Sequence, residues 1–466
     1  MLLRIGVCVA ILSSTTAIAD SPAVLDTYVR RQMAALRIPG MQVAIVQHGR
    51  LALARSYGVA SVELDVPVRD DTVFAVNSIA KTFTGVAAMR LVQSGQLDLG
   101  APVGRYVADL PELWRGVTIR QLLSHMSGLP DIMRAPTIES DAKASWNWVQ
   151  TQPTLFAAGE RFHYCQTNYV LLQRLINGLR GAAPDAPAGS EQLGAARLRW
   201  TRYGDSLDVI PHKALTYRYS PASGQPPVLQ PVWERFLPFR YAASGLNTTA
   251  TELSRWLIAI TGEGLLAPSS REVMWTPVPF NNGATGQWGL GWQILQRSTH
   301  RAVGMTGGGR AAFYLYPEHD IAVVILTNLS GAYPEDMVDA VATMFAPDIT
   351  LTGVPALRRQ REAEGYDKAA SIAARLRAEA PSEMWSEAEL NDWGYRLLAT
   401  GRIRNAVAVM KVGVEMFPMS GNAHDSLAEA LARDGDVAGA IDHYRRSLAL
   451  DPGNTNASRQ LQRLLK

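Results

Sequence analysis

The sequence predicts an α+β fold, in which an antiparallel sheet is flanked by helices and joined to a helical domain, with an all-α repeat tail after it. Three observations predict this. Strand-like pairs stand near both ends of residues 20–350, mostly helices and loops lie between them, and helical periodicity replaces strand signals after about residue 350. We therefore divide the chain into a main domain over 20–350, a helical linker over 351–385 and repeats over 386–466.

The first residues predict a cleavable secretory signal. Arg4 is the only charged residue before Asp20, the run Ile5–Leu12 is apolar, and small residues end in Ala17–Ala19. An uncleaved membrane anchor is the alternative, but the apolar run is well short of the roughly 20 residues that a span needs. We therefore expect cleavage after Ala19, no stable membrane span, and a periplasmic or secreted protein.

Four apolar segments predict strands, and turns that carry Gly or Pro join them in pairs. Each pair predicts two adjacent antiparallel strands. The last segment is apolar on both faces, which places it in the middle of the sheet. The segments are Met41–Val46, Leu51–Tyr57, Ala312–Tyr316 and Ile321–Thr327.

Helices and one long loop region are expected between these pairs. Residues 79–93 have apolar side chains at helical spacing, and Gly95 suits the end of that helix. Residues 181–235 are rich in Pro, Gly and Ala with few periodic signals, so we expect a long loop region over a cleft.

The tail contains a 34-residue period that resembles the tetratricopeptide repeat, with copies at 386–419 and 420–453 and a closing helix at 455–466. An ordinary helical hairpin tail is the alternative. Two copies are fewer than the three or so that such repeats need to stand alone, so we expect the tail to pack on the main domain or on a protein partner. The matched positions are Gly401 with Gly435, Ala406 with Ala440, Met410 with Tyr444 and Pro418 with Pro452.

Composition excludes several classes of function. The 466 residues are 47% hydrophobic and 19% charged with a net charge of +3, which is typical of a globular protein and not of a nucleic-acid-binding one. The eight histidines are scattered, and there is no H-E-x-x-H pattern, phosphate-binding glycine loop or G-x-S-x-G elbow. We therefore expect no metal and no cofactor.

A Ser-x-x-Lys pattern occurs twice and supplies the candidate chemistry. Ser140 and Lys143 lie among charged residues with no apolar helix after them, which indicates solvated surface. Ser78 and Lys81 instead open the apolar helix, where a spacing of three puts both side chains on one face. The helix N-terminus favours negative charge, and a lysine on an apolar helix is costly to bury without a role. The alternative is that Ser78 merely caps the helix.

Three further segments complete an ordered set, namely Leu123–Pro130, Phe162–Tyr169 and Gly304–Gly309. Together with Ser78 and Lys81, this set resembles the serine β-lactamase-like superfamily over about 23–350, which includes class C β-lactamases, DD-peptidases and related esterases. The resemblance implies the β-lactamase/transpeptidase-like fold.

The resemblance also implies the roles of the site residues. Ser78 is similar to the acylated nucleophile, Lys81 to its partner, and Tyr164 to the Tyr of Y-x-N that acts as general base or acid beside the charge of Lys81. The backbone N–H groups of Ser78 and Gly308 match the oxyanion hole. His125 is expected to be structural. The residues expected to bind substrate are Gln166, Met305, Thr306 and Gly307.

Two positions depart from the family pattern. Gln166 replaces the Asn of Y-x-N, and Asn168 is a second candidate for that amide. Met305 replaces the Lys or His before Thr-Gly, which removes the cation that favours a substrate carboxylate, unless Arg310 or Arg301 restores it. The loss weakens a β-lactam or DD-peptide function more than an esterase function.

The sequence therefore favours an exported serine hydrolase that cleaves an ester or amide of a small-molecule or peptide substrate through Ser78, with esters preferred. A β-lactamase or DD-carboxypeptidase is one alternative. The other is a non-catalytic interaction protein with a degenerate hydrolase domain, in which the repeat tail binds a protein partner. Cys165, beside the site, is expected to be a small buried residue and not a nucleophile.

Overall fold

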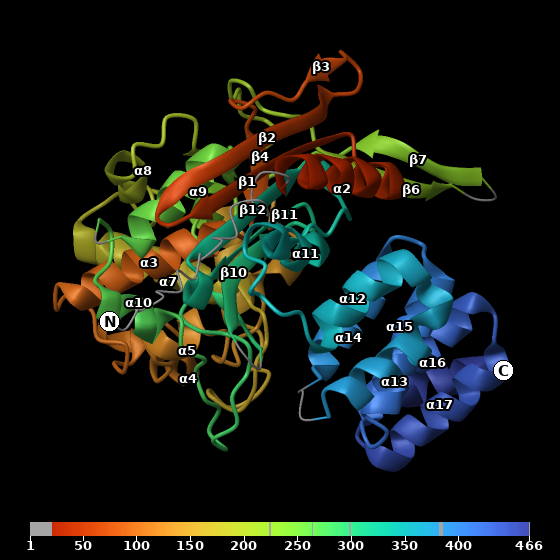
Figure 1. Ribbon diagram of the computed structural model, residues 1–466. Coiled ribbons are helices and arrows are strands. Elements are labelled where there is room, and N and C mark those ends of the chain that lie inside the picture. Colours follow the sequence, from red (N-terminus) through yellow and green to blue (C-terminus); the bar gives the residue numbers. More distant parts are fainter. Residues whose placement is uncertain (1–20, 223–224, 263, 298–299, 382–384, 466) are drawn as a thin grey trace, which may run out of the picture.

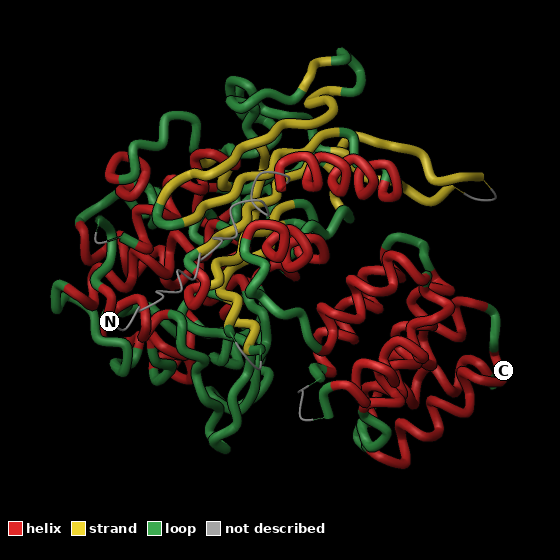
Figure 2. Tube along the Cα trace, in the orientation of Figure 1, coloured by secondary structure: helices red, strands yellow, loops and turns green. Residues whose placement is uncertain are grey.

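The computed structural model describes residues 21–222, 225–262, 264–297, 300–381 and 385–465. The expected signal segment 1–19 lies outside the described residues. The predicted α+β fold is confirmed: helices lie on both faces of one large antiparallel sheet, and a separate group of helices follows (Figures 1 and 2).

The large sheet has the strand order β3-β2-β1-β12-β11-β10-β9, and all its pairings are antiparallel. The four predicted strands are present, and the strand predicted to be central lies mid-sheet as β12. Three strands of this sheet were not predicted: β3 and β9 are very short, and β10 contains two glycines and a charged residue. The strands are β1 (Gly40–Gln47), β2 (Arg50–Ser61), β3 (Val66–Pro67), β9 (Gln293–Gln296), β10 (Arg301–Gly307), β11 (Ala311–Tyr316) and β12 (Ile321–Thr327).

Alternating side chains of the sheet enter two separate cores. On β1, Val43 and Ile45 face one core while Ala44 and Val46 face the other, as the two-residue period of a strand requires. Figure 1 shows the helices α2 (Ser21–Leu36) and α11 (Glu335–Phe345) over the first face. The larger core on the other side belongs to a helical domain made of α3 (Ala80–Gln93), α4 (Glu112–Arg115), α5 (Ile119–Leu123), α6 (Ala142–Gln150), α7 (Gln166–Arg180), α9 (Ala250–Thr261) and α10 (Pro268–Met274).

The region 181–235 was expected to be a long loop, which is wrong in part. It contains the helix α8 (Glu191–Ala195) and the strands β5 (Arg202–Tyr203), β6 (Tyr217–Ala222) and β7 (Gln225–Pro231). The strands β6 and β7 form a hairpin that pairs in parallel with β13 (Leu329–Ser330). Prolines hide the strand signal here, and an edge strand tolerates them because it needs fewer ladder N–H groups.

A small sheet positions the candidate nucleophile. In it β4 (Phe74–Asn77) pairs with β8 (Leu246–Thr248), which also pairs with β5. Ser78 follows directly after β4, so this sheet delivers Ser78 to the start of α3.

The C-terminal helices have a hydrophobic core of their own. Gly401 and Gly435 both have positive φ, and both Ala406 and Ala440 are fully buried, so the 34-residue period recurs in the geometry. The helices expected as a linker contribute Val354, Leu357 and Ala369 to this core. The helices are α12 (Gly353–Glu364), α13 (Ala369–Glu379), α14 (Glu387–Ala399), α15 (Ile403–Met416), α16 (Gly421–Asp434), α17 (Val437–Leu450) and α18 (Thr455–Leu464).

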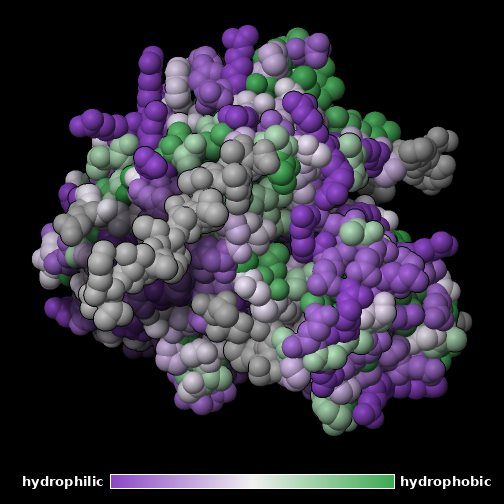
Figure 3. All heavy atoms as spheres, viewed as in Figure 1, coloured by the Kyte–Doolittle hydropathy of each residue, from purple (hydrophilic) through white to green (hydrophobic). Residues whose placement is uncertain are grey.

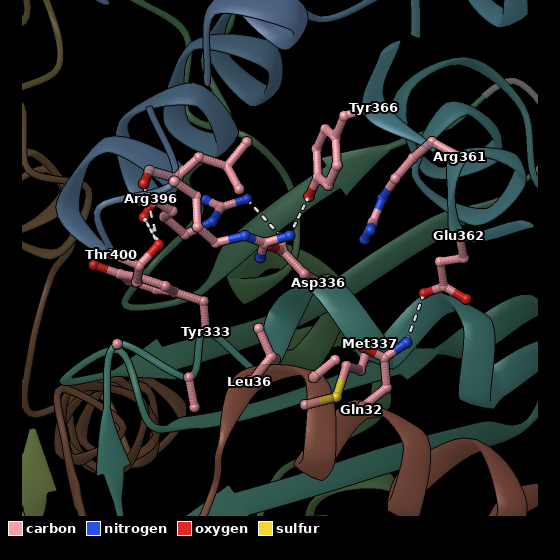
Figure 4. Close-up of a pocket in the computed structure, with 15 residues that line it drawn as sticks. Gln32, Leu36, Tyr333, Asp336, Met337, Arg361, Glu362, Tyr366, Arg396 and Thr400 are labelled. Carbon is pink, nitrogen blue, oxygen red and sulfur yellow. Dashed lines mark hydrogen bonds and ion pairs between the residues drawn. The ribbon is translucent and has the colours of Figure 1, made fainter. Parts of the chain in front are cut away.

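The junction of this tail with the main domain is largely polar. Arg396 of α14 donates to Asp336 at the start of α11 at 2.7 Å, and Gln32 of α2 donates to Glu362 of α12 at 3.0 Å. Figure 4 shows these side chains around a cavity of about 70 Å³. The tail surface seen in Figure 3 is also mainly hydrophilic. The tail therefore docks on the main domain through ion pairs rather than through a shared core.

Candidate active site

Ser78 lies at a sharp turn from strand to helix. Asn77 before it has a φ of 42°, a left-handed conformation that residues with a side chain rarely adopt. The N–H of Ile79 donates to the carbonyl of Val76 at 3.1 Å, which closes the turn. Ser78 is half-buried, so its hydroxyl stays within reach of a substrate at the entrance to α3.

Lys81 is completely buried one helical turn after Ser78. Its Nζ lies 3.5 Å from Ser78 Oγ and donates to the carbonyl of Ala243 at 2.8 Å. The rings of Tyr164 and Tyr169 lie 4.7 Å and 5.3 Å from the same nitrogen. Burial lowers the pKa of Lys81 well below its usual value, which favours a neutral amine that can accept a proton.

The hydroxyl of Tyr164 is close to the side chains of both Ser78 and Gln166. Burial raises the pKa of this hydroxyl above the ordinary phenol value, and the two neighbouring side chains only partly oppose this. We expected the charge of Lys81 to make Tyr164 more acidic, but the desolvation of both groups dominates. The arrangement therefore favours a neutral phenol that relays a proton and an amine that accepts it.

The amide of Gln166 sits differently from the expected pattern. It contacts the hydroxyl of Tyr164, and its Oε1 is buried without a hydrogen-bond partner among the described residues. Asn168 does not replace it, because Asn168 is fully buried and accepts a bond from Ser127 at 2.6 Å. Gln166 therefore has an unpaired carbonyl oxygen close to Tyr164.

Gly307 lies against the backbone of the nucleophile turn. A Cβ on Gly307 would stand 1.9 Å from the carbonyl oxygen of Val76 and 3.3 Å from the nitrogen of Ser78, so only glycine fits. Gly308 follows with a φ of 58° in a turn closed by the N–H of Arg310. Within the described ranges, neither the N–H of Ser78 nor that of Gly308 donates to another protein group. These are the two donors expected for an oxyanion.

An ion pair that the sequence did not predict supports both donors. Arg310 is 1% exposed, and its Nη2 donates to both carboxylate oxygens of Glu234 at 2.6 Å and 2.5 Å. Asn77 Nδ2 donates to the same carboxylate at 3.0 Å. Glu234 therefore joins the residue before Ser78 to the turn that holds Gly308. No local signal could reveal it, because Glu234 lies in the aperiodic region 181–235.

The cation lost at Met305 is not restored by either expected arginine. Arg310 is engaged with Glu234, and Arg301 forms ion pairs with Glu272 and Glu318 at 2.8 Å and 3.1 Å at the other end of β10. Met305 itself is 2% exposed and packs in the core of the helical domain.

Thr306 lies apart from the other candidate substrate-binding residues. Its side chain lines a cavity shared with Glu335 of α11 and Arg396 of α14. Of the segment Met305–Gly307, only Gly307 therefore lies against the nucleophile turn.

Aromatic side chains form a wall beside Tyr164. Trp288 stacks on Phe162 with ring centroids 5.4 Å apart and lies 5.7 Å from the ring of Tyr164. Phe162 is 37% exposed, so this wall reaches the surface. The sequence did not predict Trp288, which stands in a loop without a motif.

His125 and Cys165 are buried behind this wall. His125 Nδ1 accepts from the N–H of Cys165 at 3.0 Å, and the ring of His125 lies 4.4 Å from that of Tyr164. The thiol of Cys165 contacts the carbonyl of Leu129 at 3.5 Å, and burial raises its pKa to about 12. These contacts favour packing roles for both residues, and the raised pKa disfavours the reactive thiolate at neutral pH.

The second Ser-x-x-Lys pattern lies at the surface, as expected. Ser140 and Lys143 are both exposed. We expected no apolar helix after Ser140, but the amphipathic helix α6 begins at Ala142 and buries Val149. Its apolar residues are too few to mark a buried helix by periodicity alone.

A family model described as Beta-lactamase matches residues 25–346 of this chain. The chain belongs to the β-lactamase family. Protein flp of Staphylococcus aureus (strain MRSA252) is 24% identical over 345 residues, which span 70% of this chain and 66% of that protein. Penicillin-binding protein 4* of Bacillus subtilis (strain 168) is 28% identical over 352 residues, which span 71% of this chain and 76% of that protein.

Solved structures of the β-lactamase fold superpose on the same part of the chain. The octameric penicillin-binding protein homologue from Pyrococcus abyssi has a TM-score of 0.61 at 24% identity and covers 73% of this chain and 80% of its own. EstCE1, a hydrolase with promiscuous acyltransferase activity, has a TM-score of 0.59 at 21% identity. The match covers 70% of this chain and 100% of EstCE1. These two neighbours show the fold.

No group of three or more His, Cys, Asp or Glu side chains in the described residues is arranged to hold a metal ion. No helix within them is long and apolar enough to cross a membrane.

Proposed function

We propose that this member of the β-lactamase family is a serine hydrolase that cleaves esters, and less readily amides, through an acyl-enzyme on Ser78. One observation carries the proposal: the fully buried Nζ of Lys81 lies 3.5 Å from Ser78 Oγ, and burial lowers the pKa of that amine. The distance is long for a hydrogen bond, and such contacts tighten when substrate binds.

The reaction follows from these positions. Ser78 Oγ attacks the carbonyl carbon of the substrate while its proton passes to Lys81 Nζ, directly or through the hydroxyl of Tyr164. The N–H groups of Ser78 and Gly308 stabilise the oxyanion of the tetrahedral intermediate. Collapse breaks the bond to the leaving group, which takes the proton through Tyr164. Water then attacks the acyl-enzyme by the same steps and releases the acid and free Ser78.

The preference for esters rests on the electrostatics of β10. Met305 is uncharged and buried, and both Arg301 and Arg310 are engaged in ion pairs. A β-lactam or a D-alanyl peptide has a carboxylate that needs a cation at this strand, whereas a neutral ester does not. β-Lactamase or DD-carboxypeptidase activity is the second candidate. Hydrolysis rates for p-nitrophenyl esters, nitrocefin and D-alanyl-D-alanine peptides, measured side by side, separate the two.

Covalent labelling tests whether the protein is catalytic at all. We expect a fluorophosphonate probe to label the purified protein and not the Ser78→Ala variant, because the probe traps an activated serine. If the protein is not labelled, or if Ser78→Ala is labelled equally well, the hydrolase proposal fails. The remaining candidate is then a non-catalytic interaction protein, which the unpaired Oε1 of Gln166 and the uncharged Met305 would favour.

We also propose that the protein is exported and cleaved after Ala19, and that its tail binds a protein partner. The charged start, short apolar run and Ala17–Ala19 segment support export. N-terminal sequencing of the mature protein should begin at Asp20. Cross-linking from introduced surface residues of α16 or α18 should capture the partner of the tail.

A further inference from the structure

Arg240 lies in the segment whose backbone also accepts a hydrogen bond from Lys81. It ends the short helix at Pro238–Arg240, and its carbonyl accepts from the N–H of Ala243, whose own carbonyl accepts from Lys81 Nζ. The side chain extends to the loop of Met133, where Nη2 lies 3.0 Å from the thioether sulfur. Arg240 is 4% exposed.

The guanidinium group of Arg240 has no anionic partner. Among the described residues, its one hydrogen-bond acceptor is the sulfur of Met133, and its Nε is buried with no acceptor at all. Burial lowers its pKa, while Glu139, Asp131 and Glu234 oppose that effect, in this order of strength. Glu139 is exposed, and it forms no ion pair with Arg240 among the described residues. Glu234 is bound to Arg310, and Asp131 accepts from backbone N–H groups. A buried cation left in this state is costly unless it has a role.

Hydrogen bonds link the loop that Arg240 contacts to the start of α7. Asp131 Oδ1 accepts from the N–H of Gln166 at 3.2 Å and from that of Met133 at 3.1 Å, so the loop of Met133 meets the start of α7. The charge of Arg240 contributes to lowering the pKa of Lys81. Met133 is 41% exposed, so the outer side of the guanidinium group lies behind one flexible side chain and not behind rigid backbone.

We propose that Arg240 binds an anionic group of the substrate, a carboxylate in the acyl part or in the leaving group. This inference rests on the proposed hydrolase function and narrows its substrates to acidic esters. A thioether is a weak hydrogen-bond acceptor. A substrate carboxylate that displaces the sulfur of Met133 would therefore give Arg240 the charged partner that it lacks within the protein. The position differs from that of Met305, which is itself uncharged.

A purely structural role is the alternative. The guanidinium group lies 5.3 Å from the ring of Phe236 and fills space between two loops. In that case the loss of Arg240 would harm the hydrolysis of all substrates alike. Substrate discrimination therefore separates the two roles.

The kinetic test compares matched charged and neutral esters with the Arg240→Met and Arg240→Lys variants. Mono-p-nitrophenyl glutarate and p-nitrophenyl butyrate differ by a carboxylate in the acyl part, and 4-acetoxybenzoate and phenyl acetate by one in the leaving group. Because a charge-assisted hydrogen bond is removed, we expect Arg240→Met to lower kcat/KM for one charged ester by roughly 10- to 100-fold. For the neutral ester, kcat/KM should change by less than about 2-fold. Arg240→Lys should recover part of the kcat/KM that Arg240→Met loses for the charged ester.

Arg174→Met is the matched control. Arg174 lies over the ring of Trp146 at 4.7 Å and also has a buried nitrogen without an acceptor, but it contacts no candidate site residue. It should leave both members of each ester pair unchanged. Equal losses for charged and neutral esters in Arg240→Met, or no preference of the native protein for either charged ester, would overturn the inference.

A binding measurement separates this inference from the proposed function. In the Ser78→Ala protein, we expect glutarate to raise Tm at constant ionic strength, glutaramide not to, and the added Arg240→Met change to abolish the effect. If glutarate raises the Tm of both proteins equally, or of neither, Arg240 is not the anion site. If the Arg240-dependent shift is present but no ester is hydrolysed by the native protein, only the hydrolase proposal fails.

Discussion

Glu234 and Arg310 form a two-pronged ion pair directly behind the glycine turn of the candidate site, with Nη2 of Arg310 at 2.6 Å and 2.5 Å from the two carboxylate oxygens. Because Asn77 also donates to this carboxylate, one side chain ties together the two backbone segments that carry the N–H groups of Ser78 and Gly308. The spacing between the two oxyanion donors therefore depends on a residue that contacts no substrate.

Replacing Glu234 with Gln should lower kcat more than it changes KM. The amide keeps the shape of the side chain but removes the charge, so the two donors lose their fixed spacing and kcat should fall by about 10- to 100-fold. Steady-state kinetics on a p-nitrophenyl ester measure this. Glu318→Gln is the control, because Glu318 pairs with Arg301 at the far end of β10, and it should leave kcat unchanged. An unaltered kcat in Glu234→Gln would show that the turn holds its geometry alone.

Gly307→Ala should abolish activity while the protein still folds. The added methyl group would stand 1.9 Å from the carbonyl oxygen of Val76, so the strand and the nucleophile turn must separate. We expect kcat/KM to fall by about 100-fold or more. Gly178→Ala in α7 is the counterpart, since nothing lies within 4 Å of its new Cβ, and it should stabilise the helix by about 0.5–1 kcal/mol. Ester hydrolysis and thermal unfolding of both variants check the pair, and near-normal activity of Gly307→Ala would contradict the proposed oxyanion geometry.

The rate should depend on pH through Lys81. Catalysis needs the neutral amine, so kcat/KM should rise with pH through the lowered pKa of Lys81 and level off well below pH 10.5. No fall from ionisation of Tyr164 is expected near pH 10, because its pKa is raised. Lys81→Arg introduces a permanent charge and cannot accept a proton, so it should lose about 100-fold or more in rate. A rising limb centred at the ordinary lysine value would contradict this assignment.

The same burial makes Lys81 a source of instability. Since its folded-state pKa is lowered, the unfolded chain binds the proton more tightly. The cost is fully present below the folded-state pKa and disappears as pH rises to the ordinary lysine value. Lys81→Met should therefore raise the free energy of unfolding at pH 7 by about 1 kcal/mol while it abolishes hydrolysis. Urea denaturation at pH 7 and pH 10 measures both parts, and the gain should shrink at the higher pH.

Cys165 should not be needed for catalysis. Its thiol is 1% exposed and has a pKa of about 12, so N-ethylmaleimide at pH 7.5 should leave the folded protein active and unmodified. Mass spectrometry should find the adduct only after unfolding in guanidinium chloride. Cys165→Ala should retain ester hydrolysis, and a loss of activity with normal thermal stability would restore the thiol as a candidate nucleophile.

Removing Arg396 should loosen the tail from the main domain. Its side chain donates to Asp336 at 2.7 Å, so Arg396→Met leaves that buried carboxylate with Arg358 at 3.3 Å as its other cation. We expect faster proteolytic cleavage within 351–385 with ester hydrolysis retained. Arg404→Met is the control, because Arg404 is 92% exposed and 3.9 Å from Asp434. Equal cleavage rates in both variants would show that other contacts hold the junction.

Local sequence patterns predicted those features that depend on neighbours in the chain. The hairpins follow from apolar segments joined by turns that carry Gly or Pro, and the pair Ser78 and Lys81 follows from helical spacing. Glu234 stands 157 residues from Asn77 and 76 from Arg310, so its role depends on chain segments that only the folded sheet brings together. For the same reason, the sequence did not predict that Arg240 and Trp288 lie near the candidate site.

The strand β10 shows a second limit. Its sequence RAVGMTG has two glycines and a charge, which weaken any strand signal, although Gly304 and Gly307 are there because other backbone segments approach them closely. The two glycines that allow other backbone segments to approach β10 therefore also make β10 hard to predict as a strand from its sequence.

The short connection between α11 and α12 has a consequence for the tail. Residues 346–352 join the last helix of the main domain to the first helix that packs with the tail core. A tether this short holds two surfaces at an effective concentration on the order of millimolar. We therefore expect the polar junction to stay closed within one chain. A molecule that competes with Arg396 for Asp336 at the start of α11 must bind more tightly than that effective concentration lets the tail rebind.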